Sequence, residues 1–333
     1  MILAMMKYRV LGRTGLKVSE LGLGDHEYRR PLPTTLRRWG DIDDDQFALR
    51  QPERNALIKR AVENGVNYFD TTQTEEAKSL GIALKEQGLR GRVLIAGMII
   101  SPLRRLAESP RSKWHETVIE AVEERFRLLQ TDQIDILNIH MPEDNYSSDR
   151  LEATLKALRE IKDQNRIGWI GASSHQPCFL AEVMRKYDCF DSIMMRYNYH
   201  LQEAREDLFP LCKAFDVGVV VMKPLSWPYY GIPFTRFSPE REEETYLTPA
   251  QNCLRWILTS TEVSTLVPGI NTFQELEENT EAITKEGQIN ESVLAHHLAL
   301  AKSPLGKESL VKMLQDPDID IRHFAHRALA GEE

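Results

Sequence analysis

The sequence predicts an α/β protein built as one (β/α)8 TIM barrel, with an N-terminal β-hairpin and a C-terminal helical extension. Two observations favour the barrel. Eight short apolar runs alternate with longer helical patterns, which is typical of β/α units around a parallel sheet, and eight strands close such a barrel. In addition, no Gly-x-Gly-x-x-Gly follows the first strand, which disfavours an open doubly wound sheet.

The elements follow in chain order. The hairpin precedes the repeating units, with alternating runs on both sides of the turn residues Gly12 to Gly15. The expected strands are Glu20–Gly24, Asn67–Asp70, Val93–Met98, Ile134–His140, Gly168–Ser173, Ser192–Arg196, Gly218–Met222 and Thr265–Val267. The expected helices are Glu53–Asn64, Glu75–Glu86, Lys113–Leu129, Arg150–Asp163, Phe179–Tyr187, Glu203–Phe215, Pro249–Thr259 and Phe273–Ile283.

Two loops are longer than the rest, Arg29–Gln51 after the first strand and Ser226–Thr248 after the seventh. Barrel active sites are built from the loops at this end of the strands, so both are expected to form walls of a pocket. The alternative is that either is a surface insertion.

The barrel is expected to occupy residues 7–285, and residues 286–333 form a C-terminal extension. Beyond Asn290 the pattern is purely helical and resembles one HEAT-type repeat. A single repeat cannot bury its own apolar face. The extension therefore packs on the barrel or on a partner subunit, which includes a second copy of this chain.

Composition narrows the class of partner. The chain of 333 residues has a net charge of −8, whereas nucleic acid or an anionic membrane calls for a basic surface. A small-molecule substrate is expected instead. The four cysteines form no C-x-x-C pair, so no metal site is expected. Neither a signal peptide nor a membrane-spanning run is found, so we expect a cytoplasmic protein.

Polar residues at the carboxyl ends of barrel strands are the candidates for catalysis. At or just beyond these ends the sequence has Asp70, His140, Ser173, Ser174, Arg196 and Lys223. We therefore expect a polar ring at one mouth of the barrel.

Several motifs on and around this ring resemble the aldo-keto reductases. They are YRVLGRTGLKVSELGLG at the start, GVNYFDTT around Asp70, IDILNIHMP around His140, IGASS, RYN, VVVMKPL and VSTLVPGINTFQELEEN. They occur in the order of the family and span about residues 7 to 285. The resemblance implies that a hydride passes between a nicotinamide cofactor and a carbonyl carbon.

The same resemblance implies a proton donor that this chain does not have. In the family a Tyr hydroxyl donates the proton, a Lys paired with an Asp lowers the pKa of that Tyr, and a His orients the substrate oxygen. Asp70 and His140 match the Asp and the His. The stretch TTQTEEAKSLG contains no Tyr and is about two residues short, and Met98 stands where the Lys is expected. The chain is thus identified as an atypical member that lacks the catalytic Tyr and Lys.

Loss of the Lys removes the usual cation beside Asp70, so either the pKa of Asp70 rises or another cation takes its place. Our hypothesis is that Lys223 or a protonated Asp70 takes part in proton transfer with His140. Alternatively, Asp70 holds the loop after its strand, His140 is a core histidine, and Lys223 is solvated or faces a phosphate. His26, Tyr28 and Arg196 are candidates for substrate binding, and His26 and Tyr28 are alternatively plain loop positions.

For the cofactor, the resemblance implies that Ser173 and Ser174 contact the nicotinamide amide and that Met194 and Met222 contact its ring. The residues implied at the adenosine end are Gly269, Asn271, Glu275, Glu278 and Asn279. Relatives that prefer NADPH carry Arg or Lys at positions 271 and 275, and Glu275 would repel a 2′-phosphate. NAD(H) is therefore favoured over NADP(H), unless Glu275 is only a solvated face residue.

Three functions are consistent with these residues. The first is an NAD(P)-dependent oxidoreductase of aldo-keto reductase type, acting on a small carbonyl or alcohol through a remodelled proton relay. The second is a non-redox lyase or epimerase that uses Asp70, His140 and Lys223. The third is a catalytically inactive, cofactor-binding regulatory protein.

Overall fold

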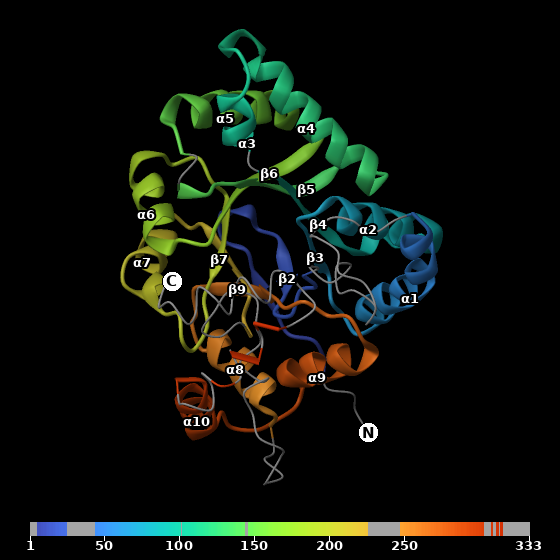
Figure 1. Ribbon diagram of the computed structural model, residues 1–333, viewed down its shortest axis with the longest axis vertical. Coiled ribbons are helices and arrows are strands. Elements are labelled where there is room, and N and C mark those ends of the chain that lie inside the picture. The colour runs from blue at the N-terminus through green and yellow to red at the C-terminus, as the bar shows by residue number, and fades with distance from the viewer. Residues whose placement is uncertain are drawn as a thin grey trace.

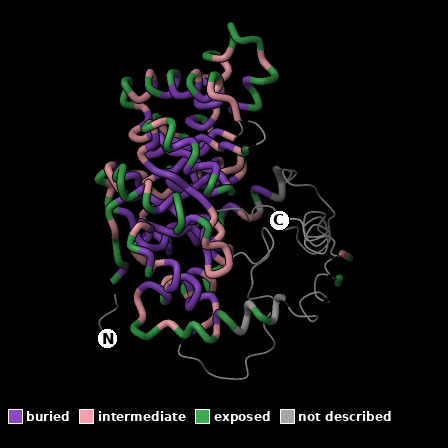
Figure 2. The backbone as a smooth tube through the Cα atoms, turned by 90° about the vertical axis from the view of Figure 1, so that its left-hand side faces the viewer, coloured by how far each residue is buried: buried purple, intermediate pink, exposed green. Residues whose placement is uncertain are grey.

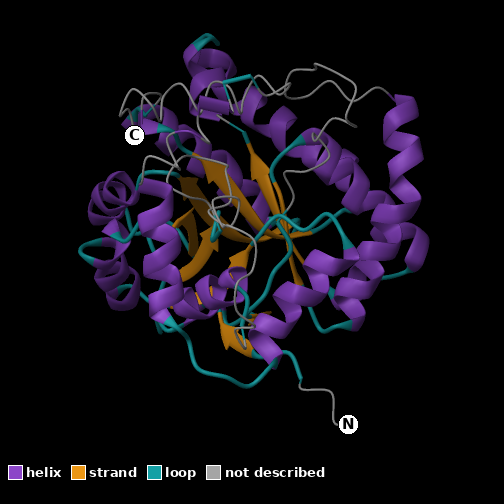
Figure 3. Cartoon of the chain, turned by 60° about the horizontal axis from the view of Figure 1, so that its bottom comes forward, coloured by secondary structure: helices purple, strands orange, loops and turns teal. Residues whose placement is uncertain are grey.

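The computed structural model describes residues 5–24, 44–100, 102–143, 146–225 and 247–302, together with residues 308, 311, 312, 314 and 315. Seven parallel strands follow one another around a ring that helices enclose (Figures 1 and 3). They are β3 (Tyr68–Thr71), β4 (Leu94–Ile99), β5 (Ile134–His140), β6 (Ile167–Ser174), β7 (Ser192–Arg196), β8 (Gly218–Met222) and β9 (Val263–Val267).

The segment expected to be the first strand, 20–24, joins the two edges of this sheet. Leu21 forms a parallel bridge with Leu266 of β9, and Leu23 forms one with Phe69 of β3. The Leu23 N–H donates to the Tyr68 carbonyl at 2.9 Å. The ring is therefore completed by single bridges, and the predicted (β/α)8 TIM barrel is confirmed.

Gly24 shows how closely this segment approaches β9. A Cβ atom at Gly24 would lie 2.7 Å from the Val267 carbonyl oxygen, nearer than atoms normally come. Glycine lets the two backbones meet without that clash.

The predicted hairpin closes the end of the barrel opposite the carboxyl ends of the strands. Strands β1 (Tyr8–Val10) and β2 (Lys17–Ser19) pair antiparallel around a 3₁₀ turn, Gly12–Thr14. Leu11 and Val18 are fully buried and belong to the apolar cluster inside the barrel. The N–H of Arg13 donates to the Asp216 carbonyl just before β8. The hairpin thus covers the interior of the barrel at this end.

Helices surround the strands (Figure 1). Their bounds are α1 (Asp44–Glu63), α2 (Thr74–Gln87), α3 (Pro102–Ala107), α4 (Trp114–Leu129), α5 (Ser148–Asp163), α6 (Pro177–Lys186), α7 (Leu208–Ala214), α8 (Pro249–Leu258), α9 (Phe273–Thr284) and α10 (Glu291–Lys302). Buried residues gather inside this ring and exposed residues on its outer side (Figure 2).

Helix α10 belongs to the C-terminal extension and lies against α8 (Figure 1). Its Leu294 is buried in the main core, and the Asn290 N–H donates to the Asn252 side chain of α8 at 2.7 Å. The part of the extension that the structure describes as a helix therefore packs on the barrel.

Helix α3 was not expected from the sequence, and two other helices differ markedly from their expected bounds. Helix α1 begins at Asp44, so residues 44–51 are helical rather than part of the long loop. Phe47, Gln51, Arg54 and Ile58 are buried at helical spacing, and Pro52 is exposed on the other side. Packing of this face outweighs the helix-breaking tendency of the proline.

The expected helix 203–215 is instead a 3₁₀ turn, Glu203–Arg205, followed by α7. Pro210 is the third residue of α7. A proline is tolerated in the first turn of a helix, where its missing N–H has no partner to lose, but not in the interior. Pro210 therefore places the helix start at Leu208.

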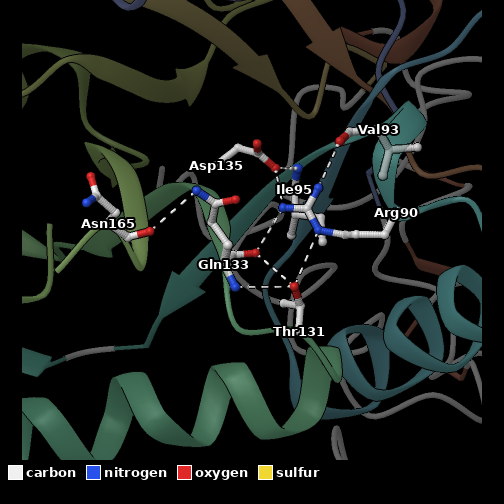
Figure 4. A network of polar contacts seen from close by, with 7 residues as sticks. All are labelled: Arg90, Val93, Ile95, Thr131, Gln133, Asp135 and Asn165. Carbon is white, nitrogen blue, oxygen red and sulfur yellow. Dashed lines mark hydrogen bonds and ion pairs between the residues drawn. The ribbon is translucent and has the colours of Figure 1, made fainter.

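Acidic side chains fasten the amino-terminal edge of the sheet. Asp135 of β5 accepts from the Ile95 N–H at 2.8 Å and from the Arg90 guanidinium at 2.9 Å (Figure 4). Asp191, one residue before β7, makes the same kind of contact between β6 and β7. It accepts from the Ile170 N–H and from Lys162, each at 3.0 Å. Both aspartates hold neighbouring strands in register at the end away from the mouth.

Candidate active site

The mouth of the barrel collects side chains from the carboxyl ends of its strands. His140 of β5 pairs in register with Ser173 of β6, and Arg196 of β7 pairs with Met222 of β8. Met98, Met194 and Met222 belong to the cluster inside the barrel, which is separate from the core between strands and helices. The mouth therefore has an apolar floor beneath a polar ring.

Asp70 lies in β3, with 6% of its surface exposed. Its N–H donates to the Leu23 carbonyl of the closing segment at 2.9 Å. Its charge, together with burial as the larger cause, raises the pKa of Tyr68 well above its ordinary value. On the neighbouring strand β4, Met98 is buried and brings no charge to this side of the pocket.

The turn after Asp70 is held by two buried charged residues that the sequence reasoning missed. Glu76, in the first turn of α2, accepts from the N–H groups of Thr72 at 2.8 Å and Gln73 at 2.7 Å. Arg125 of α4 donates to the carbonyl oxygens of the same two residues at 3.2 and 3.3 Å. Both the backbone N–H groups and the backbone carbonyl oxygens of this turn are therefore hydrogen-bonded to buried charged side chains, which clamp the turn. The spacing of Gln73 and Glu76, a capping box, was the signal available in the sequence.

His140 ends β5, with its ring partly buried. Burial, and then the positive charge of Lys223, lower the pKa of His140 from its ordinary value. A neutral imidazole both donates and accepts a hydrogen bond, so His140 is suited to take a proton near neutral pH.

Lys223 follows β8 directly, with a backbone φ of 53°. This left-handed conformation is unfavourable for any residue that carries a Cβ atom, and it persists only where the surroundings impose it. Its carbonyl accepts from the Asn198 side chain at 3.3 Å. Burial, followed by the charge of Arg196, lowers the pKa of Lys223 to about 7, and Glu76 opposes that shift.

His175, which the sequence reasoning also missed, lies just beyond β6. Its ring is 6.3 Å from that of His140, centroid to centroid, in an edge-to-face arrangement. Arg196 donates from Nε to the His175 carbonyl at 2.9 Å. The Glu143 N–H, beyond β5, donates to the Gln176 side chain at 3.3 Å. These contacts tie the segments after β5, β6 and β7 together, and the only signal in the sequence was a histidine after IGASS.

The residues expected to hold the nicotinamide end line one side of the mouth. Ser173 and Ser174 are buried at the end of β6, and Ser173 pairs with both His140 and Met194. Hydroxyl groups beside methionine side chains suit an amide on an apolar ring.

The residues expected at the adenosine end follow β9. Gly269 bridges Gly24, and Thr272 caps α9. Glu275 folds back on the start of the helix, where its carboxylate accepts from the Asn271 N–H at 2.7 Å and from the Thr272 N–H at 3.3 Å. A helix N-terminus ordinarily attracts phosphate. In this chain the Glu275 carboxylate accepts from the N–H groups at the start of the helix instead.

Helix α9 holds the other two residues of that motif. Glu278 accepts from the Thr248 hydroxyl at 2.6 Å, and Asn279 is buried. His26 and Tyr28 lie outside the described residues, as do residues 226–246 of the seventh loop. The structure therefore brings the candidates on the strand ends together and leaves those two untested.

Across the described ranges, no three His, Cys, Asp or Glu side chains are grouped so as to hold a metal ion. Among the same residues, no helix has both the length and the apolar character needed to cross a membrane.

Comparison with known proteins gives consistent results. The model of the family described as "Aldo/keto reductase family" matches residues 41–229, more than half of the chain. Aldo-keto reductase AMT2 of Alternaria alternata is 28% identical over 251 residues, covering 66% of this chain and 65% of that protein. The match thus spans slightly less than two thirds of that relative. L-galactose dehydrogenase of Arabidopsis thaliana is 26% identical over 302 residues, covering 84% and 89%.

Solved structures agree in fold. Aldo-keto reductase AKR11C1 from Bacillus halodurans, in its apo form, is similar with a TM-score of 0.59 and 25% identity, covering 89% of this chain and 96% of that one. The thermostable aldo-keto reductase Tm1743 gives a TM-score of 0.65 at 24% identity, covering 89% and 100%.

Proposed function

Because the chain belongs to the aldo/keto reductase family, we propose that it is an oxidoreductase that transfers a hydride between a nicotinamide cofactor and a small carbonyl or alcohol substrate. The observation that carries this proposal is the placement of His140 and Lys223 at the carboxyl ends of β5 and β8, where the charge of Lys223 acts on His140. Burial, followed by the charge of Arg196, lowers the pKa of Lys223 to about 7, and burial, followed by the charge of Lys223, lowers the pKa of His140 from its ordinary value. Near pH 7, Lys223 can therefore give or take a proton, and a neutral His140 can accept one.

The proposed division of roles follows from position. Asp70, His140 and Lys223 form the proton relay, which replaces the Tyr and Lys of the family, and Arg196 contacts the substrate. The expected pair His26 and Tyr28 remains assigned to the substrate side. The clamped turn at Thr72 and Gln73 supports this remodelled relay, because Glu76 and Arg125 fix a turn that offers no tyrosine.

The chain's residues fit a nicotinamide cofactor, which supplies hydride transfer when bound. Ser173 and Ser174 offer hydroxyl groups for the amide, and Met194 and Met222 offer apolar contact. At the other end, Gly269, Asn271, Glu278 and Asn279 lie along one loop and helix. This donor set supports the assignment of these residues to the cofactor.

We further assign NAD(H) rather than NADP(H) as the preferred cofactor. Glu275 already accepts the N–H groups of Asn271 and Thr272. A 2′-phosphate there would meet a negative charge and would compete for the same donors. The 2′-hydroxyl of NAD(H) meets neither obstacle.

The remaining assignments concern the whole chain. Residues 7–285 are the catalytic barrel and residues 286–333 an extension, with self-association through its helices as one use. We propose a cytoplasmic location, and a small molecule rather than nucleic acid or membrane as the partner. The net charge of −8 supports the second point.

The test combines binding and turnover. Titration with NADH and NADPH, followed by nicotinamide fluorescence, is expected to give tighter binding of NADH. A panel of small aldehydes, ketones and alcohols is expected to change nicotinamide absorbance in proportion to product. Asp70→Asn, His140→Gln and Lys223→Ala each lower that rate.

Other outcomes would assign other functions. Product without any net change in nicotinamide absorbance would indicate the lyase or epimerase chemistry. Cofactor binding without product would indicate a regulatory protein. Full turnover in both Asp70→Asn and Lys223→Ala would contradict the proposed relay.

A further inference from the structure

The proposed reaction needs a route by which a proton leaves the pocket, and the second histidine at the mouth lies on such a route. His140 ends β5, where a substrate oxygen would sit. His175 follows β6 and is itself followed by Gln176, which is exposed to solvent. His175 therefore lies beside His140 and next to a residue that is exposed to solvent.

The two rings are close and held in place. Their centroids are 6.3 Å apart, with an angle of 66° between the ring planes. Because ring nitrogens lie about 1 Å from a centroid, two nitrogens that face each other across this gap are within reach of one bridging water. The Arg196 side chain holds the His175 backbone at 2.9 Å, and His140 is fixed by its register with Ser173. Neither histidine depends on a long loop for its position.

We propose that His140 and His175 form a two-imidazole relay that carries the proton of an alcohol substrate from the pocket to solvent. The inference rests on the proposed function. It specifies the direction of the reaction, which is oxidation of an alcohol with reduction of the cofactor. His175 takes the proton from His140 and does not need to touch the substrate. It is therefore a positioning residue that acts through His140.

A bound oxidised nicotinamide, held by Ser173, Ser174, Met194 and Met222, would supply the acceptor for the hydride, which takes both electrons of the alcohol C–H bond. The O–H bond breaks, its electron pair forms the second bond of the carbonyl group, and its proton goes to the neutral nitrogen of His140. One N–H proton of the resulting imidazolium passes to His175 and then to water, so both histidines end neutral.

The charges around the rings favour this direction. Two positive groups act on the pair: the charge of Lys223, after β8, acts on His140, and Arg196 of β7 holds the His175 carbonyl. Asp70 on β3 and Glu143 after β5 are the acidic residues that follow the neighbouring strand ends. Burial and Lys223 lower the pKa of His140, so near pH 7 the ring starts neutral, as a base must. The same positive charges make the imidazolium unstable and speed its loss of a proton to His175.

The experiment replaces the second ring without emptying its place. His175→Phe keeps an aromatic ring and removes its nitrogens, and His115→Phe is the matched control, since His115 lies on α4 and pairs with Glu160 at 2.7 Å. The alcohol oxidation rate, its pH profile and its solvent deuterium isotope effect are compared with and without added imidazole.

The relay predicts at least a ~10-fold lower kcat in His175→Phe, with a larger solvent isotope effect. Added imidazole restores part of the rate, and NADH affinity stays within about twofold, since the cofactor contacts are untouched. A kcat equal to that of the His115→Phe control would overturn the relay. So would a loss that imidazole does not rescue and that leaves the isotope effect unchanged.

A second measurement separates the relay from the proposed function. Histidine-selective NMR titration needs no substrate, and two coupled imidazoles titrate in two linked steps. In His175→Phe the relay predicts one step for His140, at a higher pKa, because the repulsion of a second imidazolium is gone. An unchanged His140 titration overturns the relay even if wild-type turnover is observed. A changed titration without any alcohol oxidation would show that the two imidazoles are coupled while the oxidoreductase assignment has failed, so the two failures are distinguishable.

Discussion

At the scale of single residues, the protonation of Lys223 is linked to the stability of the folded state. Its pKa falls from 10.5 to about 7 on folding, chiefly through burial. Between these values the unfolded chain holds a proton that the folded chain has released. Stability therefore rises with pH across this window and is lost as the pH falls through about 7.

Lys223→Met removes this dependence. We expect the free energy of unfolding of wild type, minus that of the variant, to rise by about 1–3 kcal/mol between pH 7 and 9.5. Urea unfolding followed by tryptophan fluorescence at the two pH values measures it. Lys113→Met, at an exposed lysine, should show no such rise. A constant difference for Lys223→Met would mean that the folded-state pKa is ordinary.

Glu275 carries the prediction on cofactor choice. In Glu275→Gln the amide oxygen can still cap α9, but the negative charge is gone, so NADPH affinity should rise by about tenfold while NADH affinity changes little. Fluorescence titration with both cofactors measures the ratio. Glu277→Gln, at an exposed position on the same helix, serves as the control. An equal change in both variants would attribute the effect to net charge alone.

Sequence alone located the strand-end residues of the site because position along a barrel strand fixes which end a side chain occupies. Asp70, His140 and Arg196 needed only the right strand boundaries. Glu76 and Arg125 were missed because their importance lies in contacts with the same short turn, made from two different helices. His175 was missed because a histidine one residue beyond a strand has no periodic pattern.

At the scale of elements, β6 depends on a glycine at its centre. A Cβ atom at Gly171 would overlap the Asn138 side-chain oxygen of β5 and lie 2.9 Å from the Ser192 hydroxyl of β7. The neighbours on both sides are therefore packed into the space that a side chain would take.

Gly171→Ala is expected to lower the free energy of unfolding by about 1–3 kcal/mol, through overpacking inside the barrel. Chemical denaturation measures the loss. Gly91→Ala, where a Cβ atom would meet nothing within 4 Å, is the control and should change stability by less than about 0.5 kcal/mol. Similar losses in both variants would show that lost backbone freedom, and not the neighbours of Gly171, sets the effect.

Strands were predicted to within a residue or two, because each is a short apolar run between turn residues. The predicted helix boundaries were less accurate where a proline lies near the start of the helix. Pro52 suggested a helix start that packing of Phe47 and Gln51 overrode. Pro210 marked the true start of α7, although the apolar pattern extended further back. Local patterns record what a segment favours, but not which face a neighbour covers.

At the scale of the whole molecule, Arg9 joins the hairpin to the end of the barrel. Its guanidinium pairs with Glu20 at 2.7 Å and donates to the carbonyl oxygens of Leu258 at 2.7 Å, Ser260 at 3.0 Å and Val263 at 2.7 Å. One side chain thus connects the first part of the chain with residues about 250 positions later.

Arg9→Gln is expected to lower the free energy of unfolding by about 2–3 kcal/mol, because several charge-assisted hydrogen bonds are lost together. Thermal unfolding monitored by circular dichroism measures the change. Lys7→Gln, at an exposed position in the same hairpin, should leave the midpoint almost unchanged. Equal midpoints for the two variants would mean that the hairpin does not stabilise the barrel through Arg9.

The closing segment has a consequence for how the chain is made. Residues 20–24 are synthesised before the other barrel strands, yet the Glu20 carbonyl meets Thr265 only 245 positions later. At ~5–20 residues per second this segment waits about 10 to 50 s for its partner on β9. During that time the side of the segment that faces β9 is an unpaired edge, open to chaperones and to misassembly. Closure of the ring is therefore a late event in the formation of the barrel.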